Sequence, residues 1–198
     1  MLEAFLSSVT LVAISEIGDK TQLLALVLAA RFRRPWPICL GILVATVFNH
    51  AAAGWVGQLL AAWLRPEWLQ WGLAASLFLM AGWMLIPDKI DEDELPKENS
   101  HHSIFWTTCV AFFIAELGDK TQIATVLLAA KYAAVDLGLV SVVLGTTAGM
   151  LLANVPVVWF GGKLAQKIPL RLIHMLSAGL FVVLGVATLL SDTQHFAS

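Results

Sequence analysis

Two copies of one short charged motif carry the side chains of this sequence that are best suited to chemistry. Residues 16–22 read Glu-Ile-Gly-Asp-Lys-Thr-Gln, and residues 116–122 read Glu-Leu-Gly-Asp-Lys-Thr-Gln. The two copies differ at one position, where one aliphatic residue replaces another. Each copy lies inside a long apolar stretch, where a charged side chain costs about 2.5–3.5 kcal/mol even on a lenient membrane-insertion scale. Charges placed twice at such a cost indicate a functional site.

The charge balance of the two motifs matches a divalent cation. We predict four metal ligands: Glu16, Asp19, Glu116 and Asp119. Together with Lys20 and Lys120 they sum to −2 when all are ionised, which one divalent cation would neutralise. Carboxylate and carbonyl oxygens suit hard cations such as Ca²⁺, Mg²⁺ and Mn²⁺. On a regular helix the Glu, Asp and Lys of one motif project within about a third of the circumference, so they can share one site.

A glycine inside each motif predicts a local break in the helix. Glycine weakens a helix by about 1 kcal/mol relative to alanine, and an unwound segment in a membrane is tolerated where it lines a site. Such a break would turn the threonine hydroxyls and glutamine amides toward the carboxylates. The supporting residues that we predict on this basis are Gly18, Thr21, Gln22, Gly118, Thr121 and Gln122.

An ion pair between residues four apart is the structural alternative to a metal site. Glu16 with Lys20, and Glu116 with Lys120, could pair along one helix face and hold a bundle together. This alternative leaves the two aspartates buried without partners. Within the metal-site interpretation, each lysine either pairs with its own glutamate while the site is empty or extends along the helix to a water-filled vestibule.

The motifs lie in two of six apolar segments, each near the roughly 20 residues that a membrane-spanning helix needs. We predict helices over 4–30, 36–63, 68–86, 104–130, 137–162 and 170–190. Charged residues and prolines separate these segments, and five tryptophans fall near the predicted ends, as membrane interfaces favour. The predicted fold class is therefore an all-α integral membrane protein with six transmembrane helices.

The six helices form two repeats of three. We divide the chain into a first three-helix repeat (1–87), an acidic linker (88–103) and a second three-helix repeat (104–198). An odd number of helices in each repeat places the two repeats in opposite orientations. This inverted-repeat architecture is typical of transporters, whose substrate sites lie at the repeat interface near the middle of the membrane.

Further polar and small residues match between the second helices of the two repeats. His50 and Asn154 occupy equivalent positions and either complete the cation shell or form an interhelical hydrogen bond. Small residues at matched positions predict close helix packing rather than a site: Gly41, Ala45, Gly145 and Gly149.

The distribution of basic residues predicts the orientation. One side of the membrane would hold Arg31, Arg33, Arg34, Lys89, Lys97, Lys163, Lys167 and Arg171, and the other would hold Arg65 and Lys131. Because cytoplasmic loops carry an excess of Lys and Arg, we expect loop 88–103 to be cytoplasmic and both termini to be periplasmic. That loop, with His101 and His102, is either a solvated linker or an attractor of cytosolic metal.

The composition excludes several function classes. The 198 residues are 59% hydrophobic and 13% charged, against about 45–50% and about 25% in soluble domains. A mean hydropathy of +0.80 excludes a soluble enzyme. The 12 Lys and Arg against 14 Asp and Glu form no basic patch, so we expect no nucleic-acid partner. Cys39 and Cys109 lack the spacing of a zinc site.

The doubled Glu-x-Gly-Asp-Lys-Thr motif, one copy opening each half, resembles the signature of a family of cation transporters. Its members include the human Golgi protein transmembrane protein 165, its yeast and chloroplast relatives, and bacterial manganese exporters. The resemblance covers essentially the whole chain, with no departure inside either motif. It implies export of Mn²⁺, or of Ca²⁺ in some relatives, from the cytosol in exchange for protons. The family motif maps onto residues 16, 18–21, 116 and 118–121.

We therefore expect a secondary transporter of the bacterial inner membrane, with Mn²⁺ or Ca²⁺ and protons as its partners and no cofactor. Competition of H⁺ and metal for the same carboxylates would suffice for antiport. An exporter of another small solute, such as an amino acid, is the nearest alternative, and a channel or a purely structural bundle are further ones. An intramembrane enzyme has no support, because neither an HExxH nor a GxSxG motif is present.

Overall fold

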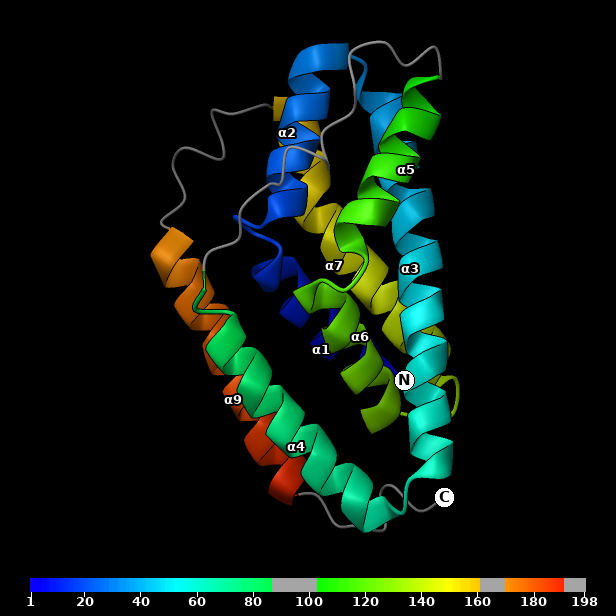
Figure 1. Ribbon diagram of the computed structural model, residues 1–198, viewed down its shortest axis with the longest axis vertical. Helices are drawn as coiled ribbons and strands as arrows, with labels where there is room; N and C mark the ends of the chain where they lie inside the picture. Colours follow the sequence, from blue (N-terminus) through cyan, green and yellow to red (C-terminus); the bar gives the residue numbers. More distant parts are fainter. Residues whose placement is uncertain (87–102, 161–169, 191–198) are drawn as a thin grey trace.

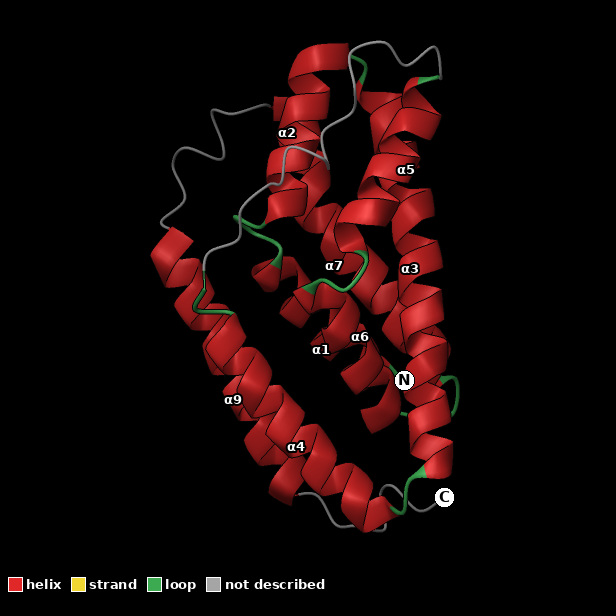
Figure 2. Ribbon diagram, viewed as in Figure 1, coloured by secondary structure: helices red, strands yellow, loops and turns green. Residues whose placement is uncertain are grey.

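The computed structural model describes residues 1–86, 103–160 and 170–190, with side chains of the last range described from residue 175. These ranges fold into helices and contain no strand (Figures 1 and 2). The helices are α1 (Leu2–Ser15), α2 (Lys20–Phe32), α3 (Pro35–Trp63), α4 (Pro66–Trp83), α5 (Ile104–Glu116), α6 (Lys120–Lys131), α7 (Gly138–Phe160) and α9 (Leu170–Leu190). The prediction of an all-α protein is confirmed. Of the predicted linker, residues 88–102 lie outside the described part.

All six predicted segments are helical, and two of them are broken in the middle. The segment 4–30 is divided into α1 and α2, and the segment 104–130 into α5 and α6. Both breaks fall at the charged motifs, where the sequence predicts unwinding. Among the described residues, α3 and α7 have the length and apolar composition of a membrane span, whereas the half-helices are too short to qualify singly.

Prolines and left-handed residues set the limits of α2, α3 and α4. Pro35 and Pro66 occupy the first turns of α3 and α4, where the missing N–H costs no hydrogen bond. Arg33 ends α2 in the left-handed conformation, with φ of 51°. Short connections therefore join α2 to α3 and α3 to α4.

In each repeat, the N-terminal half of the broken first helix packs against the long second helix of the other repeat. Thus α1 lies on α7, and α5 lies on α3, side by side in Figure 1. A Cβ at Gly41 would lie 2.8 Å from Thr108 Cβ, and one at Gly145 would lie 2.6 Å from the Phe5 carbonyl oxygen. Gly149 is equally close to Val9. The prediction that these glycines serve close packing is confirmed, and the packing interlocks the two halves.

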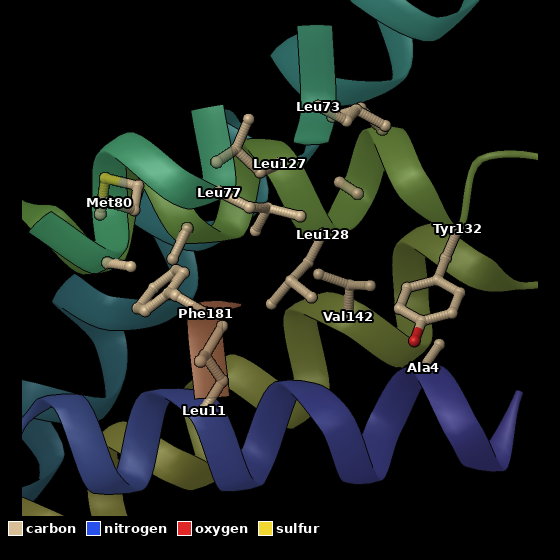
Figure 3. Close-up of a cluster of buried hydrophobic side chains, with 14 of the residues drawn as sticks. Ala4, Leu11, Leu73, Leu77, Met80, Leu127, Leu128, Tyr132, Val142 and Phe181 are labelled. Carbon is tan, nitrogen blue, oxygen red and sulfur yellow. The ribbon is translucent and has the colours of Figure 1, made fainter. Parts of the chain in front are cut away.

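The third helices of the two repeats, α4 and α9, form a pair beside the interlocked helices (Figure 1). The amide of Gln70 in α4 donates to the Thr188 carbonyl of α9 at 3.0 Å. Leu73, Leu77 and Met80 of α4 and Phe181 of α9 pack toward Leu127 and Leu128 of α6 in one apolar cluster, shown in Figure 3. The pair thereby supports the broken helix of the second repeat from one side.

Candidate cation site

The first motif forms a tight break between α1 and α2, and hydrogen bonds of its backbone N–H groups close the turn. The α1 helix ends at Ser15, and Gly18 has a φ of 86°, a conformation that L side chains rarely adopt. The Gly18 N–H donates to the Gln22 side-chain oxygen at 2.9 Å, and the Asp19 N–H donates to the Glu16 carbonyl at 3.1 Å. Asp19 then begins α2 as its N-cap residue. The glycine and the glutamine of the motif therefore stabilise the break. The prediction that the amide turns toward the carboxylates is wrong for Gln22, because its Nε2 donates to the Ala153 carbonyl.

The second motif repeats this geometry. Gly118 has a φ of 76°, and its N–H donates to the Gln122 side-chain oxygen at 2.7 Å. The Asp119 N–H donates to the Glu116 carbonyl at 3.2 Å, and Asp119 is the N-cap residue of α6 with a ψ of 166°, against 168° at Asp19. Identical sequences thus give the same local fold in both halves.

The break allows the threonine of each motif to hydrogen-bond to the glutamate of the same motif. The Thr21 hydroxyl donates to Glu16 Oε2 at 2.5 Å, and the Thr121 hydroxyl donates to Glu116 Oε2 at 2.9 Å. A continuous helix would place residues five apart on different faces. The predicted effect of unwinding on the threonines is confirmed, and each glutamate is held in one orientation by its threonine.

Three of the four predicted ligands gather at one point. Glu16, Glu116 and Asp119 each offer an oxygen within 4.8 Å of the other two. Glu16 and Glu116 have no exposed surface, and Asp119 is 5% exposed. Asp19 is buried at the equivalent place in the first motif but is not one of these three. Carboxylates from the two repeats therefore meet, although the meeting is less symmetric than the sequence predicts.

Each of the two glutamates has one carboxylate oxygen without a hydrogen-bond partner in the described part of the chain. Within residues 1–86, 103–160 and 175–190, Glu16 Oε1 and Glu116 Oε1 are buried and accept no hydrogen bond. A buried polar atom without a partner costs about 1–3 kcal/mol, so native structures rarely keep one without cause. Two such oxygens, one from each repeat and in the same acidic cluster, are of the type that hard divalent cations take as ligands.

Each of the two motif lysines makes a contact outside its own motif. Lys20 Nζ lies 3.9 Å from Asp119 Oδ1, across the repeat interface, and Lys120 Nζ donates to the Ile86 carbonyl at 2.9 Å. The predicted pairing of Lys20 with Glu16 presumes one continuous helix. Because the break puts Lys20 at the start of α2, Lys20 is close enough to pair with Asp119 of the other repeat. The Ile86 carbonyl has no sequence signal, since any residue could supply it.

The matched polar residues of the long helices are both fully buried. Asn154 lies beside the Glu16 carboxylate and donates to the Met150 carbonyl at 3.1 Å. His50 has no exposed surface, and neither ring nitrogen has a hydrogen-bond partner in the described part of the chain. The neighbouring residues Asn49 and Ala153 tie the long helices to the broken ones. Asn49 donates to the Phe113 carbonyl at 3.2 Å, and Ala153 accepts from Gln22 at 3.1 Å.

Comparison with known proteins gives the same family for both halves. The family model described as "Divalent cation/proton antiporter GDT1" matches residues 4–92 and again residues 104–196. The chain is 52% identical to the "putative manganese exporter" of Vibrio cholerae over 181 residues, covering 91% of this chain and 88% of that protein.

More distant relatives are found in a plant and in Synechocystis. Identity is 27% with GDT1-like protein 5 of Arabidopsis thaliana, over 98% of each chain. It is 29% with a GDT1-like protein of Synechocystis, over 84% of this chain and 89% of that protein. No solved structure gives a significant match. The family model matches both halves, and the similarity to the Vibrio cholerae protein covers most of both chains. The chain therefore belongs to the GDT1 family of divalent cation/proton antiporters.

Proposed function

We propose that this protein exports Mn²⁺ from the cytosol in exchange for protons, through one site that Glu16, Glu116 and Asp119 form at the interface of the repeats. The observation that carries the proposal is the pair of buried, unpartnered oxygens, Glu16 Oε1 and Glu116 Oε1, within an acidic cluster that both repeats build. The name of the relative from Vibrio cholerae supports Mn²⁺ as the cargo. Ca²⁺ is the second cargo that oxygen ligands would accept.

Metal and proton would use the same oxygens in turn. Carboxylates bind either H⁺ or a cation, so loading of one expels the other, and exchange follows without a separate proton path. Asp19, buried and equivalent to Asp119, would join the shell as the fourth carboxylate. The threonine donors on Glu16 and Glu116 would keep the free oxygens directed at the cation, as outer-shell hydrogen bonds do in metal sites.

The membrane arrangement follows from the repeats. Six passes, with α1–α2 and α5–α6 each serving as one broken span, would place both motifs near the middle of the bilayer. The excess of basic residues around Arg31–Arg34 and in the 88–103 linker puts that side in the cytosol and the termini in the periplasm. Rocking of one repeat against the other would then expose the site to each side alternately.

Transport into inside-out membrane vesicles tests this function. Vesicles that carry the protein should accumulate Mn²⁺ when their lumen is acidic, and the accumulation should saturate with Mn²⁺ and collapse when the pH gradient is dissipated. Addition of Mn²⁺ should release protons from the lumen. Uptake that neither saturates nor responds to the gradient would indicate a channel, and a lack of uptake of both Mn²⁺ and Ca²⁺ would refute the proposal.

A further inference from the structure

His50 is a buried titratable side chain for which the acidic cluster alone leaves no role. It lies in the middle of α3 with no exposed surface, and both its ring nitrogens lack a hydrogen-bond partner in the described part of the chain. A neutral imidazole has one donor and one acceptor, and burying both without partners is unfavourable. Burial of the His50 side chain is therefore unfavourable unless a further contact satisfies one of its ring nitrogens.

The packing of α3 places His50 at the level of the second helix break. Earlier along α3, Gly41 lies against Thr108 of α5, and Asn49 donates to the Phe113 carbonyl three residues before Glu116. Later along α3, Gly57 lies against Val126 of α6. The α3 helix thus passes first α5 and then α6, and His50 falls between these contacts, where the chain breaks at residues 117–119.

The direction in which the His50 side chain projects agrees with this position along α3. At about 100° per residue, His50 projects within about 40° of Gly54 and about 20° of Gly57 around the α3 axis. Gly57 lies against Val126 of α6, and Gly54 lies mainly against Leu139 of α7, so His50 is on the face of α3 that is turned toward α6 and α7. Its repeat equivalent, Asn154, lies beside the Glu16 carboxylate of the first break. The two repeats therefore present an amide to one break and an imidazole to the other.

We propose that His50 supplies a nitrogen ligand to the transported cation and thereby makes the site prefer Mn²⁺ to Ca²⁺. This inference rests on the proposed function. Ca²⁺ takes oxygen ligands, whereas first-row transition cations also bind imidazole nitrogen well. The ligand atoms of the carboxylate cluster, which lie within 4.8 Å of one another, are all oxygens, and His50 is not part of the cluster. To bind the cation, the imidazole ring would therefore rotate toward it. Coordination would satisfy one of the two unpartnered nitrogens.

Pulsed electron paramagnetic resonance of Mn²⁺ bound to the purified full-length protein tests the contact directly. The wild type should show ¹⁴N modulation typical of imidazole, which changes when histidine alone is labelled with ¹⁵N, and His50→Asn should abolish it. A second variant keeps His50 and replaces the other four histidines by Asn: His101, His102, His174 and His195. This variant should keep the modulation, so the assignment does not depend on the folding of His50→Asn.

A comparison of Mn²⁺ and Ca²⁺ transport tests whether His50 sets the preference for Mn²⁺. In His50→Asn the ratio of kcat/KM for Mn²⁺ to that for Ca²⁺ should fall at least about tenfold, the size of effect expected even for an outer-shell residue. Thr46→Val is the matched control, because Thr46 is buried one turn earlier on α3 and also lacks a hydrogen-bond partner in the described part. Its ratio should stay at the wild-type value.

The outcomes separate this inference from the function beneath it. Bound Mn²⁺ without imidazole modulation, or an unchanged Mn²⁺-to-Ca²⁺ ratio in His50→Asn, would overturn the role of His50 and leave the exchanger intact. An equal loss of transport for both cations would assign His50 to structure alone. Failure of the wild type to bind or move Mn²⁺ would overturn the proposed function, and this inference with it.

Discussion

Lys20 Nζ lies 3.9 Å from Asp119 Oδ1, so the ammonium of the first motif meets a carboxylate of the second. Lys120, at the identical place in the second motif, donates to the Ile86 carbonyl that follows α4. Each motif lysine thus makes a contact outside its own motif.

Removal of the Lys20 charge should separate metal binding from turnover. Lys20→Ala takes a positive charge away from Asp119, so Mn²⁺ affinity should stay the same or increase. The empty carrier would lose a partner for a buried carboxylate, so its return step, and with it the rate of exchange, should slow. Calorimetric titration and vesicle flux on the same preparation measure the two quantities. Unchanged flux would show that the ion pair has no part in the cycle.

Neutralising either glutamate should abolish export without preventing insertion. Glu16→Gln and Glu116→Gln each remove an anionic ligand and a proton acceptor, whereas an uncharged side chain is easier to place in a membrane. Glu67→Gln is the control, because Glu67 is exposed in the first turn of α4. Mn²⁺ flux and the amount of protein in the membrane should be measured together. Poor expression of the glutamate variants would favour a structural ion network over a cation site.

Loss of a threonine hydroxyl should weaken metal affinity while the protein remains folded. Thr121→Val keeps the side-chain shape but removes the donor to Glu116 Oε2, and the KM for Mn²⁺ should rise by roughly 10- to 100-fold. Thr125→Val, one turn later on α6, is matched in burial, but its hydroxyl donates to the Thr121 carbonyl within the helix. Its KM should change little. Equal effects of both variants on KM would mean that the hydroxyl does not orient the carboxylate.

A methyl group at Gly118 should destabilise the protein through the backbone alone. A Cβ at this position would meet nothing within 4 Å, but the φ of 76° would cost a non-glycine residue about 1–2 kcal/mol. Gly82 in α4 has the same open space and a helical backbone, so Gly82→Ala should be neutral or stabilising by about 0.5–1 kcal/mol. Thermal unfolding in detergent compares the two. A similar midpoint for both variants would contradict the role assigned to the left-handed glycine.

The sequence determines much of this protein by local rules. Long apolar segments fix the helices, and the repeated motif with its glycine fixes where two of them break. The same motif also predicts that each threonine turns toward its glutamate, because the residues involved are neighbours along the chain. Such features follow from hydropathy and backbone freedom, which short stretches of sequence carry by themselves.

Tertiary structure alone decides how the two halves meet. Identical motifs cannot predict that Asp119 joins Glu16 and Glu116 while Asp19 does not, or that Lys20 lies beside Asp119 of the other repeat. Nor can sequence spacing show that His50 is fully buried with neither ring nitrogen partnered in the described part of the chain. These relationships depend on how α1 packs on α7 and α5 on α3, and long-range packing selects one of several arrangements that the same local structure allows.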